Sequence, residues 1–107
     1  MAREKIGVVG VDSGQLMVCD PCYVDGDWKR DLPEGWKPPE DSDNQPFSYE
    51  GACNLSCGKK RGGQMVFKMG HAGAGVAVST GFGDGTYSVY LERDKEGRPK
   101  RLIVNLQ

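Results

Sequence analysis

The sequence predicts an all-β fold, a small sandwich or partly open barrel of about seven short, mostly antiparallel strands. Two observations predict it. Glycine makes up 16 of the 107 residues, about twice its usual share, and divides the chain into short segments. Within those segments, β-branched and aromatic residues alternate with polar ones, which is the period of a half-buried strand. No segment has the period of a helix, and we expect one domain over residues 1–107.

The beginning of the chain predicts a β-hairpin. Residues 6–11 and 15–19 are apolar segments of strand length, and residues 12–14 between them form a short Asp-Ser-Gly turn. Gly14 is expected to supply the positive φ that such a turn needs. Pro21 ends the second strand, because proline has no N–H group to donate to a neighbouring strand.

Residues 25–46 differ from the rest of the chain. Ten of these residues are charged and four are proline, and their large apolar side chains are few. A polar segment of this length predicts a long loop, and long loops in compact domains are often functional. We expect Trp28 and Trp36 to anchor this loop to the domain or to stack on a ligand.

The remainder predicts short strands joined by glycine-rich turns. In residues 64–69, Met65, Phe67 and Met69 fall on one face of the expected strand. Residues 94–99 predict a hairpin turn with Gly97 in the left-handed conformation. The expected strands are residues 47–55, 64–69, 76–79, 86–92 and 102–106, and the expected glycine loops are residues 58–63, 70–75 and 81–85.

Composition restricts the class of protein. The net charge of −1 gives no basic footprint for nucleic acid at the level of the whole chain. No segment has the roughly 20 apolar residues that span a bilayer, and the apolar run near the start is too short for a signal peptide. We therefore expect a cytosolic protein, in which four cysteines serve as free thiols or metal ligands rather than disulfides.

Two glycine loops indicate contact with a ligand. In "GFGDG", residues 81–85, Asp84 either accepts hydrogen bonds from the loop's own N–H groups or binds a cation or a ligand hydroxyl group beside Phe82. In "CGKKRGG", residues 57–63, backbone N–H groups and a basic cluster form either an anion nest for phosphates or a solvated hairpin tip. The basic residues are Lys59, Lys60 and Arg61.

The cysteines form two closely spaced pairs, "CDPC" and "CNLSC". Two such pairs of thiolates are able to form a tetrahedral zinc site. The alternative is that Cys19 is simply a small core residue at the end of a strand. The four candidate zinc ligands are Cys19, Cys22, Cys53 and Cys57.

His71 is the one histidine, so any general-base mechanism that uses an imidazole depends on it. A small hydrolase would combine His71 with Cys22 or Asp84, or with the hydroxyl group of Ser79 or Thr80. The alternative is an exposed loop histidine that has no catalytic role.

Three segments together resemble a known family. They are "VDSGQLMVCDPCYV" near the start, "GACNLS" in the middle and "GAGVAVSTGFGDGTYSVYLERDKEGRPKRLIV" at the end. They are similar to the DUF4241 group of small uncharacterised domains from bacteria and their phages, which pair an "SG-x-L…DP" element with a "GDG-x-Y-x-V" element. The resemblance covers most of the chain except residues 25–46. Ser88 stands where the group commonly has proline.

The resemblance implies a small β domain and supplies no reaction. It also implies that the elements around Asp20 and Asp84 meet, so that Asp12, Tyr23 and these two aspartates line one polar end of the domain. We expect a non-enzymatic binding domain that captures a small molecule, for example a nucleotide signal, or a host protein. Two alternatives are a zinc-stabilised interaction domain and the small hydrolase. Exposed strand edges also allow a homodimer.

Overall fold

The computed structural model describes residues 2–29 and 44–107 and divides the chain into two compact units. The first unit comprises Met1–Gly14 and Thr80–Gln107, and the second comprises Gln15–Ser79. Across the described residues, seven strands form two sheets that are mostly antiparallel, and one short α-helix accompanies them. The expected all-β class and the number of strands are confirmed, and neither described sheet closes into a barrel.

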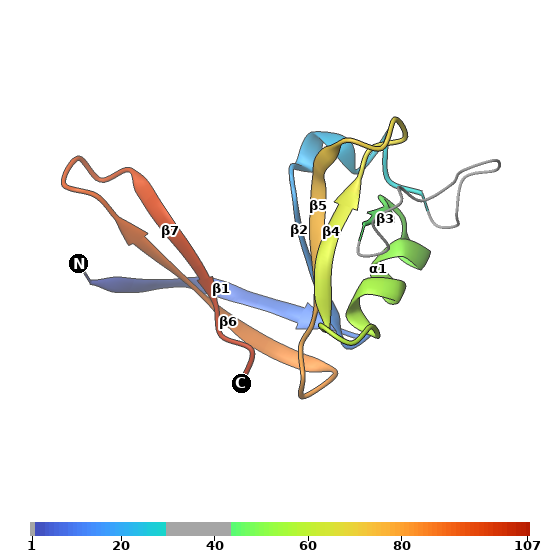
Figure 1. Ribbon diagram of the computed structural model, residues 1–107. Helices are drawn as coiled ribbons and strands as arrows, with labels where there is room; N and C mark the ends of the chain where they lie inside the picture. Colours follow the sequence, from blue (N-terminus) through green and yellow to red (C-terminus); the bar gives the residue numbers. More distant parts are fainter. Residues whose placement is uncertain (1, 30–43) are drawn as a thin grey trace. The chain divides into compact units, whose positions relative to one another are not determined.

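The first unit is a three-stranded antiparallel sheet in the order β1-β6-β7 (Figure 1). Its central strand, β6, carries Tyr87, which is 4% exposed. Tyr87 and Val11 of β1 are the two buried hydrophobic residues among the described residues of this unit. The turn between the last two strands is as expected, because Gly97 has a φ of 84°. The strands are β1 (Arg3–Val11), β6 (Gly85–Arg93) and β7 (Pro99–Val104).

The second unit is a four-stranded sheet in the order β2-β5-β4-β3, with α1 packed against β3, β4 and β5 (Figure 1). Among the described strand pairs of this unit, the short β3–β4 pair is parallel and the others are antiparallel. The hydrophobic core lies in this unit and is formed by Phe47, Ala52, Leu55, Met65, Ala74 and Ala77. The elements are β2 (Gln15–Cys19), the 3-10 helix η1 (Pro21–Tyr23), β3 (Gln45–Pro46), α1 (Tyr49–Ser56), β4 (Gly62–Val66) and β5 (Ala72–Ser79).

The expected hairpin of residues 6–11 and 15–19 is wrong. β1 pairs with β6, and β2 pairs with β5, so the two strands belong to different sheets. Gly14 does have a positive φ of 70°, but its carbonyl oxygen accepts a hydrogen bond from the Thr80 N–H group at 3.1 Å. Apolar strands separated by a short turn give no signal of which distant strand each one pairs with.

The expected strand over residues 47–55 is also wrong, because Tyr49–Ser56 form α1. Ser48 has extended backbone and its hydroxyl oxygen accepts a 2.9 Å hydrogen bond from the Gly51 N–H group, which makes Ser48 the N-cap. Ala52 and Leu55 lie three positions apart and are both buried, as a helix requires. The N-cap outweighs the weak strand preference of this segment.

The boundaries of β4 and β5 also differ from expectation. β4 ends at Val66, and β5 begins at Ala72, within the segment expected to be a loop. Gly70, with a φ of 88°, donates to the Phe67 carbonyl oxygen at 2.7 Å and closes a tight turn. Met69 is consequently 86% exposed, whereas Met65 is fully buried, so the two do not share a buried face. No helix among the described residues is long and apolar enough to cross a membrane.

Candidate functional site

A cavity of about 310 Å³ in the second unit is the candidate site. Its apolar walls include Phe47 and Val66, which are 5% and 1% exposed. Lys29, Lys68 and Asp27 are exposed lining residues, and two ammonium groups against one carboxylate give this rim a net positive charge. The lining residues are Gly26, Asp27, Lys29, Pro46, Phe47, Val66, Phe67 and Lys68.

Three chain segments are joined by backbone pairing to form the cavity. Pro46 of β3 is paired with Val66 of β4 in the parallel register. Lys29 continues this arrangement, because its N–H group donates to the Phe47 carbonyl oxygen at 3.2 Å and its carbonyl oxygen accepts from Tyr49 N–H at 2.9 Å. The cavity walls are thus held by main-chain hydrogen bonds, which restrict the movement of the lining residues before any ligand binds.

The Phe67 wall is fixed by the turn that follows it. The Phe67 N–H group donates to the His71 carbonyl oxygen at 3.0 Å, and the two rings lie 5.0 Å apart at 39°. His71 is exposed, and its ring lies against Phe67 in a tilted geometry. The structure therefore gives His71 a packing role next to the cavity, and it shows no hydrogen bond between His71 and Cys22 among the described residues.

Tyr23 and Trp28, both predicted to contact a ligand, pack around the cavity's phenylalanine rings. Tyr23 contacts Phe67 edge-on at 5.1 Å and Phe47 at 6.5 Å. Trp28 contacts Phe47 edge-on at 5.1 Å. These are favourable aromatic geometries, and they place Tyr23 and Trp28 as supports of the cavity wall rather than as lining residues. Trp36 lies outside the described residues.

Asp20 caps the η1 turn that leads to this aromatic cluster. Its carboxylate accepts a 3.0 Å hydrogen bond from the Cys22 N–H group, and this bond holds the pKa of Asp20 below its usual value. A hydrogen bond between the Cys22 thiol and the Asp20 carboxylate raises the pKa of that thiol. A raised pKa keeps the sulfur protonated at neutral pH, which opposes its use as a nucleophile or as a metal ligand.

The four cysteines have different environments. Cys19 packs against the core, as its alternative interpretation expected, and Cys53 accepts a hydrogen bond from the Gln15 side-chain amide at 3.3 Å. Cys22 and Cys57 are exposed, and none of the four cysteines forms a disulfide. In the described part of the chain, no three His, Cys, Asp or Glu side chains gather in a group able to hold a metal ion. The structure therefore does not assemble the four-thiolate site.

The basic loop lines a second, smaller cavity of about 230 Å³. Lys59 and Lys60 contribute to it beside the Asn54 side chain, whose amide donates to Gln45 at 3.2 Å. Arg61 does not line the cavity and has a φ of 58°, a conformation that residues with a Cβ rarely adopt. This cavity lies at the C-terminal end of α1, where the helix dipole favours cations, so the two lysines fit there without a bound anion.

The glycine loop of residues 81–85 belongs to the first unit. Gly81, Gly83 and Gly85 all have positive φ, as their residue type allows. The loop is held by Thr80 and Tyr87, whose hydroxyl groups donate to the Gly83 carbonyl oxygen at 2.7 and 2.6 Å. These side chains, and not that of Asp84, lock the loop.

The predicted residues of this loop point outward. Phe82 is 76% exposed and Asp84 is exposed. Asp12 and Asp84 belong to the first unit, whereas Asp20 and Tyr23 belong to the second. The prediction that these four residues line one polar end stays a prediction.

The cavity-lining residues themselves were not identified from the sequence. Phe47 and Phe67 have the appearance of ordinary strand residues, and Lys29 and Lys68 that of solvated charges. The cavity depends on the parallel β3–β4 pair, whose partners lie about 20 positions apart in the chain. One feature of the sequence could have indicated these lining residues: an aromatic and a basic residue are adjacent in "FK", residues 67–68, next to the Gly70 turn.

Comparison with known proteins agrees with the resemblance seen in the sequence. A family model described as "Protein of unknown function (DUF4241)" matches residues 1–104, which is nearly the whole chain. No curated protein and no solved structure matches it. The chain belongs to the DUF4241 family.

Proposed function

We propose that this protein is a non-enzymatic binding domain that holds a small ligand in the cavity between Lys29, Phe47 and Phe67. The ligand would have a flat apolar part and one anionic group. The observation that carries the proposal is the cavity itself, with apolar walls and a rim of two lysines and one aspartate. Small-molecule sites combine these features, a largely apolar lining with a few polar groups that orient the ligand.

The size of the cavity limits the ligand. Its volume of about 310 Å³ is at the lower end of the range typical of ligand sites. It suits a molecule of one or two rings, which includes the base of a nucleotide signal. A ligand of about 20 non-hydrogen atoms at about 0.3 kcal/mol per atom would bind with about 6 kcal/mol, a Kd of tens of micromolar.

The charge of the rim sets the sign of the ligand's charge. The Lys29 and Lys68 ammonium groups attract an anionic substituent at the mouth, where partial exclusion of water strengthens the interaction. Asp27 disfavours a second anionic group on its side of the rim. A ligand with one anionic substituent is therefore preferred over a cation or a polyanion.

Binding is favoured over hydrolysis by the chemistry of the candidate nucleophile. The hydrogen bond with Asp20 raises the pKa of the Cys22 thiol, and a hydrolase needs the opposite shift. His71 contacts the Phe67 ring rather than a nucleophile. Stoichiometric capture requires neither group.

Binding of the dye 8-anilinonaphthalene-1-sulfonate tests the proposal, because the dye is flat, apolar and singly anionic. We expect saturable binding of one dye per chain. Gly26 lines the cavity, and a Cβ built on it meets no atom of the described residues within 4 Å, so Gly26→Leu adds a side chain there without a clash with them at its Cβ. This variant should weaken dye binding at least tenfold.

Gly10→Leu is the matched control, because a Cβ on Gly10 also meets nothing within 4 Å and Gly10 lies in β1 of the other unit. It should leave dye affinity unchanged. The double variant Lys29→Gln/Lys68→Gln should weaken binding several-fold, and Lys59→Gln should not. Equal effects of Gly26→Leu and Gly10→Leu, or dye binding that neither Gly26→Leu nor the double lysine variant weakens, would contradict the proposal.

A further inference from the structure

One face of the β1–β6–β7 sheet combines several cationic side chains with a tyrosine side chain. The cross-strand register places Lys5, Tyr90 and Ile103 in one row. The next row on the same face contains Arg3, Glu92 and Arg101. Because residues directly opposite each other in antiparallel strands share a face, three cations and one tyrosine ring lie side by side on an open sheet.

The acidic residue on this face is already neutralised. Glu92 is 7% exposed, and its carboxylate pairs with Arg101 at 2.8 Å and with Arg3 at 3.6 Å. The two arginine side chains are 60% and 55% exposed, so they lie over the glutamate and extend into solvent. One carboxylate faces two guanidinium groups, and the row keeps a net positive charge.

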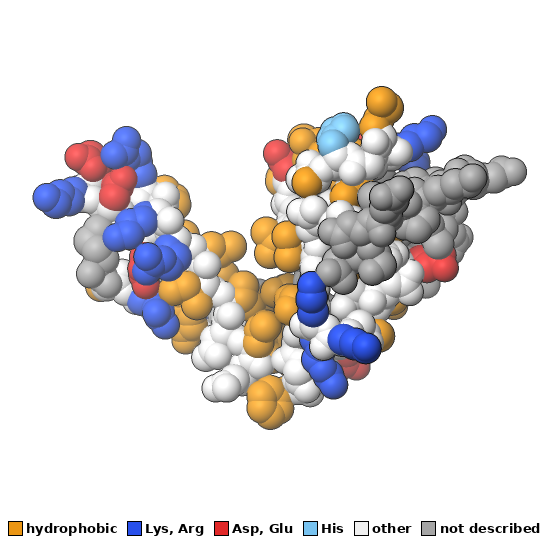
Figure 2. Space-filling model, viewed as in Figure 1, with side chains coloured by type: hydrophobic (Ala, Val, Ile, Leu, Met, Phe, Trp, Pro, Cys, Tyr) orange, Lys and Arg blue, Asp and Glu red, His pale blue; other side chains and the backbone are white. Residues whose placement is uncertain are grey.

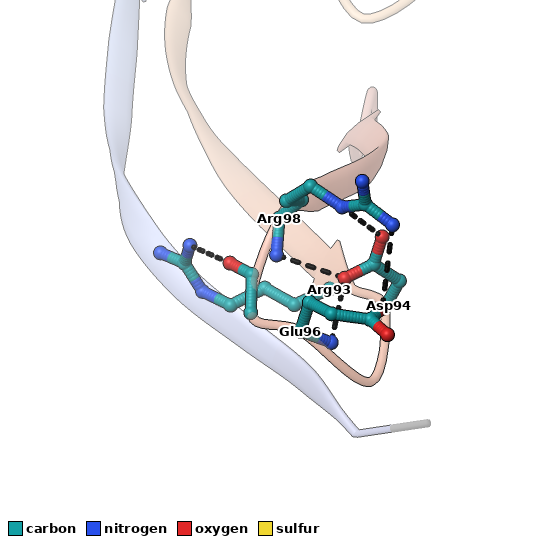
Figure 3. Close-up of polar contacts among 5 residues, drawn as sticks. Arg93, Asp94, Glu96 and Arg98 are labelled. Carbon is teal, nitrogen blue, oxygen red and sulfur yellow. Dashed lines mark hydrogen bonds and ion pairs between the residues drawn. The ribbon is translucent and has the colours of Figure 1, made fainter.

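The acidic residues around this face are also paired with arginine. Glu4 pairs with Arg93 at 2.9 Å. In the adjoining turn, Asp94 and Glu96 both pair with Arg98, at 2.8 and 3.3 Å (Figure 3). Every acidic residue of this end of the sheet is therefore engaged by an arginine of the same sheet.

Three lysines remain in excess. Lys5, Lys95 and Lys100 are exposed, and the structure gives them no ion pair within the described residues. In the space-filling view, Lys and Arg side chains gather over the end of this unit that bears the β6–β7 turn (Figure 2). The excess charge is concentrated at the same end as the row of Lys5 and Tyr90.

The net charge of the whole chain conceals this patch. Residues 25–46 carry seven acidic and three basic side chains, and they offset the basic end of the sheet in a total of −1. Local charge, rather than the total, sets the potential that a partner meets within a Debye length of about 10 Å.

We propose that this face of the β1–β6–β7 sheet binds single-stranded nucleic acid. Phosphates would contact Lys5, Lys95 and Lys100, the exposed lysines that have no ion pair within the described residues, and a base would stack on the half-buried ring of Tyr90. Cations that follow the backbone, together with aromatic rings on an open sheet that take the bases, are the features of sheet-based single-strand recognition. An acidic protein or an anionic membrane would use the same charges and would leave Tyr90 without a role.

Fluorescence anisotropy of a fluorescein-labelled 12-nucleotide oligothymidine tests this proposal on the full chain. We expect binding in 50 mM salt, weakened about 20-fold in 200 mM salt if three phosphate contacts form. Lys5→Gln/Lys95→Gln/Lys100→Gln should weaken binding at least tenfold. Lys29→Gln/Lys59→Gln/Lys68→Gln removes the same charge from exposed residues of the other unit and should leave the affinity within twofold.

Tyr90→Leu should weaken oligothymidine binding about fivefold or more and leave competition by an oligoglutamate peptide unchanged. The proposal is overturned by absence of binding at 50 mM salt, by equal losses in the two triple variants, or by a Tyr90→Leu variant with unchanged affinity. It is also overturned if oligoglutamate or phosphatidylserine vesicles compete as well as unlabelled oligothymidine. Dye binding in the cavity involves the other unit, so the two proposals succeed or fail independently.

Discussion

The hydroxyl group of Tyr87 donates a 2.6 Å hydrogen bond to the carbonyl oxygen of Gly83, four residues before it. Tyr87 is buried in the central strand of the first unit, and its hydroxyl group reaches back to fix the glycine loop that leads into that strand. The single hydroxyl proton of Thr80 is shared between the same oxygen and the Gly14 carbonyl oxygen, at 2.7 and 3.2 Å. Three glycines with positive φ give the loop its shape, and two hydroxyl groups hold it in place.

Tyr87→Phe is therefore expected to destabilise the protein. The substitution keeps the buried ring and removes one donor to a carbonyl oxygen that Thr80 still contacts, so the loss should be about 1 kcal/mol in the free energy of unfolding. Urea unfolding measures it. Tyr90→Phe is the control, because no side chain or backbone group in residues 2–29 and 44–107 forms a hydrogen bond with the Tyr90 hydroxyl group. An equal loss in both variants would contradict this role of Tyr87.

Gly51→Ala should destabilise the protein, although alanine is the better helix former. Gly51 lies in the first turn of α1, and a Cβ there would collide with the carbonyl oxygen of Pro46 in β3. Helix propensity alone predicts a gain of up to about 1 kcal/mol. We expect a loss of at least about 2 kcal/mol instead, because main-chain atoms must shift.

Thermal unfolding of Gly51→Ala should show a lowered midpoint. Asn54→Ala, on the exposed side of the same helix, is the control: it removes one exposed hydrogen bond to Gln45 without a clash and should cost no more than about 1 kcal/mol in the free energy of unfolding. A stabilised Gly51→Ala variant would show that α1 does not approach β3 as closely as described.

Asp94 is expected to make the turn between β6 and β7 sensitive to acid. Desolvation raises the pKa of Asp94, but hydrogen bonds from the Arg98 backbone, the Arg98 side chain and the Glu96 backbone together outweigh it and hold the pKa below its usual value. A depressed pKa in the folded state contributes stability above the unfolded-state value of about 3.8, and this contribution is lost as pH falls through the folded-state value.

A titration of the side-chain carboxyl carbon by NMR measures the pKa of Asp94 directly, and it should lie below 3.8. Asp94→Asn should lower the unfolding midpoint at pH 7, and its difference from the native protein should shrink as the pH approaches 2. A difference that grows on acidification would contradict the sign of this shift.

Cys22 is expected to react slowly with alkylating agents. The hydrogen bond with Asp20 raises the pKa of the thiol, and thiolate is the reactive form. Asp20→Asn should therefore accelerate alkylation of Cys22 by iodoacetamide at pH 8, as followed by peptide mass spectrometry. Cys57 is also exposed and serves as the internal reference, because its rate should not change. Slower alkylation of Cys22 in Asp20→Asn would contradict this.

The features that depend on local sequence were predictable. Tyr87, Val89 and Leu91 alternate with polar residues and form β6, and Gly97 takes the left-handed conformation that its turn requires. The partners of the strands were not predictable in the same way. The short turn at residues 12–14 resembles that of a hairpin. In the structure, however, β1 pairs with β6 and β2 pairs with β5, so β1 and β2 belong to separate sheets.

The candidate site illustrates the same limit. Tyr23, Trp28 and His71 were predicted from residue type, and they do surround the cavity wall. The lining residues Phe47 and Phe67 were not, because they converge through the parallel β3–β4 pair. Single-residue chemistry can be inferred from a sequence, whereas a cavity depends on which distant segments meet.

The most direct test of ligand binding in the cavity is an NMR titration of the ¹⁵N-labelled protein with 8-anilinonaphthalene-1-sulfonate. We predict that the largest amide shifts fall on the lining residues Gly26, Asp27, Lys29, Phe47 and Lys68, that they saturate at one dye per chain, and that Gly26→Leu abolishes them. Shifts that centre instead on Phe82 or on the basic loop at Lys59, or that never saturate, would contradict a binding site in this cavity.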